Sequence, residues 1–289
     1  MKQLIPLEWE GLLNQFRRSR MNRIDATFQR LKEENQSAFI AYVCAGDPSL
    51  AATKEIAASL DLAGVDVLEL GVPFSDPMAD GAVNQMAAER ALAGGASVRG
   101  VFELIAEIRQ TSDTPIVLYS YLNPIYTYGF ETFLRDAKQA GVDGLLLLDL
   151  PPDEQLASEE FSSTGDLHHI RLIAPTTTEE RVRSLAKMGE GFIYYVSREG
   201  VTGERQDVAA GLAERVSFLQ ESSPVPVVVG FGISTPAQAE EVARSADGVV
   251  VGSAIVKTIA QQASQADLAA KVGDVVKPLV EATKRARVA

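Results

Sequence analysis

The sequence predicts an α/β protein, a (β/α)8 TIM barrel with an N-terminal helix and extra loop helices. Strand-like and helix-like segments alternate eight times along 289 residues, a usual length for such a barrel. The strand-like segments are rich in Val, Ile, Leu and Tyr and mostly lack polar alternation, as parallel strands covered on both faces should. We expect strands over residues 39–44, 65–70, 116–119, 144–148, 170–173, 192–196, 225–229 and 248–251.

Helical patterns precede, separate and follow these strands. Ile24, Phe28 and Leu31 have helical spacing within residues 22–34, with Lys and Glu on the other face, and predict the N-terminal helix. A long helical region over 254–287 closes the chain. The helices expected between the strands cover residues 51–63, 98–109, 130–140, 153–161, 179–187, 208–220 and 236–244.

A doubly wound open sheet is the alternative fold. Its first strand usually leads into a Gly-rich dinucleotide-binding turn, but here residues 44–48 read Cys-Ala-Gly-Asp-Pro. With 46% hydrophobic residues the chain can form either one large domain or two smaller ones. No linker-like change in composition indicates two, so we expect residues 21–289 to form a single barrel domain.

Residues 1–20 differ in composition from the rest of the chain. They mix apolar residues, including Trp9, with a basic end over 17–20, an order opposite to that of a signal peptide. One interpretation is an amphipathic helix that docks on the barrel. The other, which we favour, is a non-native or poorly ordered extension ahead of a natural start at Met21.

Charge and residue counts exclude several classes of function. Lys and Arg number 27 against 39 Asp and Glu, and a net charge of −12 argues against nucleic acid or an anionic membrane as partner. No apolar run approaches the ~20 residues of a membrane span. Cys44 is the only cysteine, so no internal disulfide forms and a cytoplasmic location is expected. His168 and His169 are the only histidines, which argues against a zinc site, and we expect no metal or cofactor in this chain.

The most informative stretch is residues 67–81, an apolar strand that leads into a loop stiffened by two prolines. Glu69 lies in the strand, where an unpaired carboxylate would cost several kcal/mol. Asp76 and Asp80 lie in the loop, and either alone would be an ordinary turn former. Catalytic groups of barrel enzymes lie where strands end, so the stretch as a whole predicts an active site.

Three Gly-rich turns follow the last three expected strands, at residues 200–203, 230–234 and 252–253. Glycine lets backbone N–H groups approach an anion closely, and a helix that begins near Ser253 adds its dipole. Each turn alone is weak support, but these loops are neighbours in a barrel and commonly form its phosphate site. The sequence therefore predicts a phosphate-bearing substrate.

Taken together, these segments resemble the tryptophan synthase alpha subunit family, in the right order from about Met21 to the end. The segments that carry the resemblance are 45–48, 69–81, 197–203, 230–234 and 252–257. The resemblance implies a carbon–carbon lyase of tryptophan biosynthesis, which cleaves indole-3-glycerol phosphate by a retro-aldol reaction to indole and glyceraldehyde 3-phosphate. It also implies a pyridoxal-phosphate-dependent beta subunit that receives the indole within an α2β2 heterotetramer.

The resemblance also implies roles for particular residues. Glu69 matches the general acid/base, Asp80 the second catalytic acid, and Tyr194 a tyrosine near the scissile bond. Asp76 falls in the segment that faces the beta subunit. The residues implied to bind the substrate are Tyr42, Tyr119, Leu146, Thr202, Phe231 and Val250, and those implied to bind its phosphate are Gly203, Gly232, Gly252 and Ser253.

The chain departs from the family pattern at three places. Ala41 stands where a proline is common, Tyr119 where the pocket often has an aliphatic residue, and residues 81–84 lack the usual Gly-Pro. Two alternatives stay open. One is a stand-alone lyase that needs no beta subunit, and the other is a weakly catalytic chain that mainly activates the beta subunit; the two acids argue against the latter.

Overall fold

Parallel β-strands form the centre of the molecule. The computed structural model describes residues 21–151, 166–197, 205–230 and 232–287. Within these residues the strands form one parallel sheet in the order β5-β4-β3-β2-β1-β9-β8-β7-β6. Their bounds are β1 Ala38–Cys44, β2 Val67–Gly71, β3 Ile116–Ser120, β4 Gly144–Leu147, β5 His168–His169, β6 Arg171–Ile173, β7 Ile193–Val196, β8 Val227–Gly230 and β9 Gly248–Val251.

The sheet closes into a barrel through β5 and β6, which are two halves of one strand. Only Ile170 separates them, and β5 pairs with β4 while β6 pairs with β7. Counted this way, the nine short strands are the eight strands of a (β/α)8 barrel, which confirms the predicted fold class.

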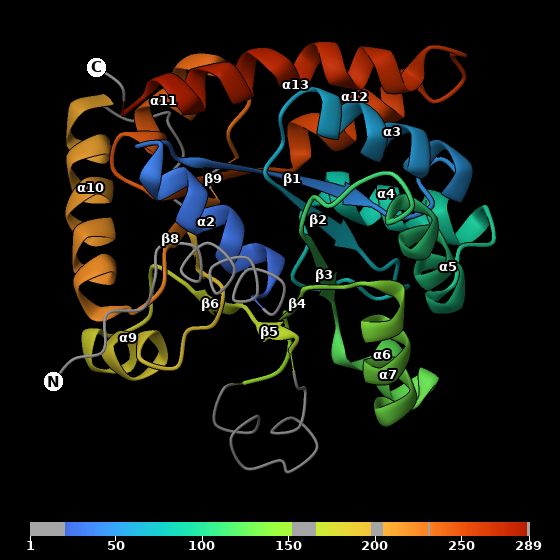
Figure 1. Ribbon diagram of the computed structural model, residues 1–289, viewed down its shortest axis with the longest axis horizontal. Helices are drawn as coiled ribbons and strands as arrows, with labels where there is room; N and C mark the ends of the chain where they lie inside the picture. The colour runs from blue at the N-terminus through green and yellow to red at the C-terminus, as the bar shows by residue number, and fades with distance from the viewer. Residues whose placement is uncertain (1–20, 152–165, 198–204, 231, 288–289) are drawn as a thin grey trace, which may run out of the picture.

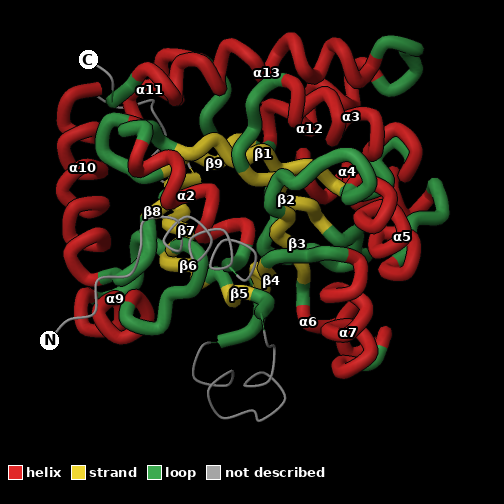
Figure 2. The backbone as a smooth tube through the Cα atoms, in the orientation of Figure 1, coloured by secondary structure: helices red, strands yellow, loops and turns green. Residues whose placement is uncertain are grey.

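Helices surround the strands on the outside (Figures 1 and 2). The long α13 runs alongside α3, α11 and α12, and α10 packs beside β8 and α9 (Figure 1). The helices are α2 Arg23–Glu33, α3 Leu50–Leu62, α4 Ala82–Ala93, α5 Val98–Ile108, α6 Leu122–Tyr128, α7 Phe130–Ala140, α9 Glu179–Ala186, α10 Arg205–Ser222, α11 Pro236–Ala243, α12 Ser253–Gln262 and α13 Leu268–Arg285.

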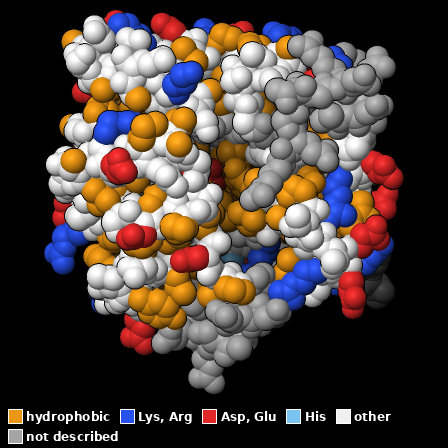
Figure 3. All heavy atoms as spheres, turned by 180° about the vertical axis from the view of Figure 1, so that it is seen from behind, with side chains coloured by type: hydrophobic (Ala, Val, Ile, Leu, Met, Phe, Trp, Pro, Cys, Tyr) orange, Lys and Arg blue, Asp and Glu red, His pale blue; other side chains and the backbone are white. Residues whose placement is uncertain are grey.

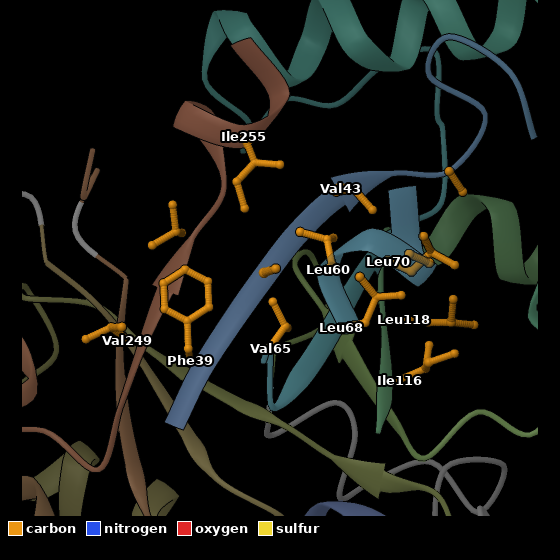
Figure 4. Close-up of a cluster of buried hydrophobic side chains, with 14 of the residues drawn as sticks. Phe39, Val43, Leu60, Val65, Leu68, Leu70, Ile116, Leu118, Val249 and Ile255 are labelled. Atoms are coloured by element: carbon orange, nitrogen blue, oxygen red, sulfur yellow. The ribbon is translucent and has the colours of Figure 1, made fainter. Parts of the chain in front are cut away.

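Alternate side chains of each strand serve two separate apolar layers, because successive residues point to opposite faces. One set packs outward under the helices; Phe39, Leu68, Ile116 and Val249 belong to it, as Figure 4 shows. The other set fills the barrel interior and consists of Ala38, Ile40, Val67, Val117, Leu146, Ile170, Phe192, Val228 and Val250.

Helix α2 seals the end of the barrel where the strands begin. Ile24, Phe28 and Leu31 are buried against the interior set, and the rings of Phe28 and Phe192 lie 5.7 Å apart. Asn22 caps the helix by accepting a hydrogen bond from the N–H of Ile24 at 2.9 Å. With this end filled, a substrate can enter only where the strands end.

Three acids, of which Asp66 and Asp143 are buried and Asp247 is partly exposed, fix the register of neighbouring strands at the sealed end. Asp66, Asp143 and Asp247 each stand just ahead of a strand and accept a hydrogen bond from a backbone N–H of the strand beside it. The donors are Phe39, Ile116 and Val227, at 2.8, 2.8 and 2.9 Å respectively. Each acid therefore ties two strands together where they start.

Each expected strand and most expected helices are present within a few residues of the predicted bounds. The region predicted as one long helix over 254–287 is two helices, α12 and α13, separated by residues 263–267. Helices α4 and α6 had no predicted position. The helix expected over 153–161 lies outside the described residues.

Candidate active site

Glu69 points into the barrel interior, one step above Val67 on β2. Its register partners are Tyr42 on β1 and Val117 on β3, whose side chains also belong to the interior. The side chain is only 2% exposed. Burial, and secondly the charge of Asp80, raise the pKa of the Glu69 carboxyl to about 8. At neutral pH Glu69 is therefore mostly protonated and can donate a proton.

Asp80 lies at the end of the loop that follows β2, and two tyrosine hydroxyls hold its carboxylate. Tyr119 donates to Asp80 Oδ1 at 2.7 Å, and Tyr121 donates to Asp80 Oδ2 at 2.8 Å. Gln85 steadies the backbone here, because its amide donates to the carbonyl of Asp80 at 3.0 Å. The acid on the loop is thus joined to the end of β3.

Helix α4 begins at Ala82, two residues after Asp80, and an ion pair anchors it to the loop that follows β1. Arg90 of α4 donates to Asp47 from Nε at 2.8 Å and from Nη2 at 2.7 Å. Asp47 is 1% exposed, and this paired geometry raises the pKa of the Arg90 guanidinium. The ion pair therefore fixes the helix that carries the loop's C-terminal end.

Tyr42 and Tyr194 each lie against a glycine of the neighbouring strand. A Cβ atom on Gly71 would lie 2.5 Å from the Tyr42 hydroxyl, and one on Gly230 would lie 2.6 Å from the Tyr194 hydroxyl. Burial and the charges of nearby acids raise the pKa of both tyrosines. The two phenols are therefore neutral, and the glycines are what give them room.

The expected indole-pocket residues that the structure describes come together in the interior. Leu146 on β4 is a register partner of Tyr119, and the rings of Tyr119 and Tyr42 meet edge to face at 5.0 Å. Val250 on β9 is 4% exposed and faces the same interior as Leu146 and Tyr194. Figure 3, viewed from behind Figure 1, shows a hollow in this side of the molecule, lined largely by hydrophobic side chains. Thr202 and Phe231 lie outside the described residues.

The expected phosphate turns that the structure describes follow two paired strands, β8 and β9. Gly232 is exposed with φ +63°, a conformation that favours glycine, and no atom would lie within 4 Å of an added Cβ. Gly252 is the N-cap of α12 and Ser253 is its first residue, so the N–H groups of this helix start are at the surface beside the turn. Gly203 lies outside the described residues.

The structure brings into the site one residue that the sequence analysis missed. Tyr121 stands two positions after Tyr119, so both side chains leave the end of β3 on the same face. That spacing is the signal that could have found it. The roles of Gly71 and Gly230 had no such signal, because glycine at a strand end is also ordinary turn chemistry.

The histidines lie apart from these acids. His168 Nε2 is 2.8 Å from Asp25 Oδ2 of α2, at the sealed end. Among the described residues no group of three or more His, Cys, Asp and Glu side chains is placed to hold a metal ion. No helix within the described ranges is long and apolar enough to cross a membrane.

This fold and site define a class of protein, a barrel enzyme with two neighbouring carboxyl groups, Glu69 and Asp80, at an apolar interior. A sequence model of the tryptophan synthase alpha chain family matches residues 28–284. The chain belongs to this family, and is a lyase component of tryptophan biosynthesis.

Individual relatives agree with the family match. The tryptophan synthase alpha chain of Opitutus terrae is 48% identical over 269 residues, which are 92% of this chain and 100% of the relative. That of Citrifermentans bemidjiense is 52% identical over 237 residues, covering 82% and 89% of the two chains. A crystal structure of the alpha chain from Legionella pneumophila superposes with a TM-score of 0.82 at 38% identity, covering 91% of this chain and 97% of the other.

Proposed function

We propose that this chain cleaves indole-3-glycerol phosphate to indole and glyceraldehyde 3-phosphate by a retro-aldol reaction. The observation that carries the proposal is the pair of acids, in which Glu69 is buried with a pKa of about 8 and Asp80 is held beside it by hydrogen bonds. The two environments differ enough to give the two carboxyl groups different tasks.

Glu69 would supply the proton that the reaction needs. In its neutral form it donates to indole C3, and the bond between C3 and the glycerol side chain can then break with its electron pair returning to the ring. The hydroxyl on the departing carbon becomes the aldehyde and loses its proton to the Glu69 carboxylate. The acid is thereby regenerated, and no external oxidant, reductant or metal takes part.

Asp80 would accept a hydrogen bond from the indole N–H. Positive charge develops on that nitrogen once C3 is protonated, and a carboxylate fixed beforehand stabilises it without reorganising. Tyr194 would lie near the scissile bond, and Tyr42, Tyr119, Leu146, Phe231 and Val250 would hold the indole ring. This arrangement is supported by the apolar interior in which the described members of the set lie.

The phosphate is proposed to bind to backbone N–H groups of Gly203, Gly232, Gly252 and Ser253. The positive φ of Gly232 and the α12 N-terminus support this, because both present N–H groups towards an anion. Thr202 would bind across to Asp80 when the substrate is present and help to exclude water.

The same proposal includes a partner subunit and a cellular location. We propose an α2β2 complex in which a pyridoxal-phosphate-dependent beta subunit takes the indole, in the cytoplasm. Solved structures of Mycobacterium tuberculosis tryptophan synthase superpose on this chain with a TM-score of 0.80 at 31% identity, which supports the kind of partner. Residues 72–81, with Asp76, would face that subunit.

The test is indole release from indole-3-glycerol phosphate by the purified chain, alone and with a beta subunit. Glu69→Gln and Asp80→Asn should each lower kcat by ~10²-fold or more while the fold survives. Glu107→Gln is the matched control, because Glu107 is an exposed acid on α5 that pairs with Lys54 outside the barrel interior. Near-normal activity of Asp80→Asn would contradict its assigned role, and an inactive parent would contradict the function itself.

A further inference from the structure

Asp80 lies on a loop, yet its proposed task needs a precise position. Residues 72–81 carry neither helix nor strand, and Asp80 itself is half-buried. Loops are the more mobile parts of a fold, whereas a catalytic group must be held within about 0.5 Å of its productive geometry. Something outside the loop must therefore fix this carboxylate.

Each oxygen of the carboxylate accepts a hydrogen bond from a different tyrosine, one within β3 and one directly after it. The hydroxyl of Tyr119 reaches Oδ1 at 2.7 Å and that of Tyr121 reaches Oδ2 at 2.8 Å. Tyr119 lies within β3, and Tyr121 is the N-cap residue of α6, one position after β3 ends. A carboxylate with one donor on each oxygen cannot rotate about its last bond without breaking both hydrogen bonds.

Aromatic packing holds each tyrosine ring in turn. Tyr119 meets Tyr42 edge to face at a ring distance of 5.0 Å, and Tyr121 lies against Phe74 at 5.4 Å. The Tyr121 hydroxyl also accepts the N–H of Ala79 at 2.9 Å, so it binds the loop backbone next to the acid.

The two hydroxyls act as donors throughout the pH range in which an enzyme works. Burial, and then the nearby Asp80 carboxylate, raise the pKa of both Tyr119 and Tyr121 above the ordinary tyrosine value. Each oxygen of a carboxylate has two lone pairs, so Asp80 keeps acceptor sites for a ligand N–H after binding both phenols.

We propose that Tyr119 is a positioning residue: together with Tyr121 it holds the Asp80 carboxylate in the orientation that receives the indole N–H before the substrate arrives. The inference rests on the proposed function. It assigns to Tyr119 a task beyond lining the pocket, because its ring forms the wall while its hydroxyl orients the acid.

The test is a comparison of Tyr119→Phe with the parent in indole release from indole-3-glycerol phosphate. The substitution keeps the ring against Tyr42 and removes only the hydroxyl. We expect kcat to fall ~10-fold with KM changed less than about twofold, because a loosened Asp80 weakens transition-state stabilisation more than substrate binding. We expect the same fall in kcat, with little change in KM, for Tyr121→Phe.

Tyr128→Phe is the matched control. The Tyr128 hydroxyl also donates to an aspartate, Asp136, at 2.8 Å, and its ring also packs on an aromatic side chain, Phe102, at 5.6 Å. This pair joins α6 to α7 outside the barrel interior. The control should lose the same kind of hydrogen bond and keep the parent's kcat.

A double-mutant cycle separates positioning from packing. In an Asp80→Ala background, assayed with enzyme in excess, Tyr119→Phe should change the rate by less than about twofold, because no carboxylate remains to orient. A kcat for Tyr119→Phe equal to the parent's, or an equal loss with and without Asp80, overturns the inference. If Tyr119→Phe fails to fold, the same comparison of kcat with and without Asp80 is made with Tyr121→Phe. An inactive parent instead overturns the proposed function, and the two failures are thereby distinguished.

Discussion

Glu69 shows how burial can be used to set the chemistry of one residue. A carboxyl 2% exposed in an apolar interior favours its neutral form, and the charge of Asp80 adds to this effect. A proton donor is the form that the proposed reaction needs first. The burial that makes this carboxyl costly to ionise is therefore also what would suit it to its proposed function as a proton donor.

The same shift makes the stability of the protein depend on pH. The Glu69 pKa is about 8 in the folded chain against an ordinary value of 4.5. Between these values the folded chain binds more protons than the unfolded chain, so Glu69 lowers stability as pH rises from about 4.5 to about 8. Glu69→Gln removes this titration. We therefore expect the melting temperature of Glu69→Gln minus that of the parent to increase by ~2 °C or more as pH rises through this range.

Thermal unfolding of Glu69→Gln and the parent at pH 5, 7 and 8.5 measures this. The melting temperature of Glu69→Gln minus that of the parent should be lowest at pH 5 and highest at pH 8.5. Glu107→Gln, which changes an exposed acid, should differ from the parent by the same amount at each pH. A difference for Glu69→Gln that does not grow with pH would show that Glu69 is charged in the folded protein.

Among the elements, the strands carry stabilising contacts at their starting ends and the residues of the proposed chemistry at their other ends. At the starting ends, Asp66, Asp143 and Asp247 bind backbone N–H groups of neighbouring strands and are paired with basic side chains. At the other ends lie Glu69 and the tyrosines that hold Asp80. Barrel enzymes in general place catalytic groups at the second of these ends and stabilising contacts at the first.

Asp66→Asn should therefore affect stability and leave chemistry alone. Asp66 is 7% exposed; it accepts the N–H of Phe39 at 2.8 Å, pairs with Arg30 at 3.1 Å and also pairs with Lys284. The substitution leaves two cations around a neutral side chain, and breaking such a buried network costs ~3 kcal/mol. Urea unfolding should show this loss, with kcat per folded molecule unchanged.

The control for this prediction is again Glu107→Gln, which breaks the exposed pair with Lys54 and should cost less than about 1 kcal/mol. If Asp66→Asn is as stable as that control, the acids at the starting ends do not pin the strands. A fall in kcat with unchanged stability would show that the two ends are coupled.

The elements that the sequence predicted and those that it did not differ in a physical way. The strands have long apolar residues at most positions, so they stand out from the helices. Helix α4 does not stand out, because its buried side chains are Ala87, Ala88 and Ala91, too small to give an apolar stripe. Helix α6 is short and has Pro124 near its start, which resembles a turn.

The same contrast holds for the candidate site. Glu69 could be found in the sequence because a carboxylate is unusual among the apolar residues of a buried strand. Tyr119 and Tyr121 give no such signal, since tyrosine is a common strand residue. Their contact with Asp80 also joins positions about 40 apart in the sequence. Such a contact depends on how β2 and β3 pair and on the path of the loop after β2, which local patterns do not contain.

For the molecule as a whole, we propose that residues 21–289 form a single barrel domain to which the first 20 residues do not belong. The family match begins at residue 28, and the relative from Opitutus terrae aligns over its whole length with 269 residues of this chain. Met21 as the first residue keeps Asn22, whose side chain caps α2 and donates to the carbonyls of Asp143 and Asp166 at 2.8 Å each.

A chain that starts at Met21 should thus melt within about 2 °C of the full chain and release indole at the same rate. It should also lose all tryptophan fluorescence, because Trp9 is the only tryptophan. A chain that starts at Asn35 is the contrasting variant, since it lacks Ile24, Phe28 and Leu31, which are each at most 6% exposed and fill the sealed end. Losing three such core side chains should lower the free energy of unfolding by more than a typical domain has, so that variant should not fold. A melting temperature several degrees lower for the Met21 chain would show instead that the first 20 residues pack on the barrel and belong to its domain.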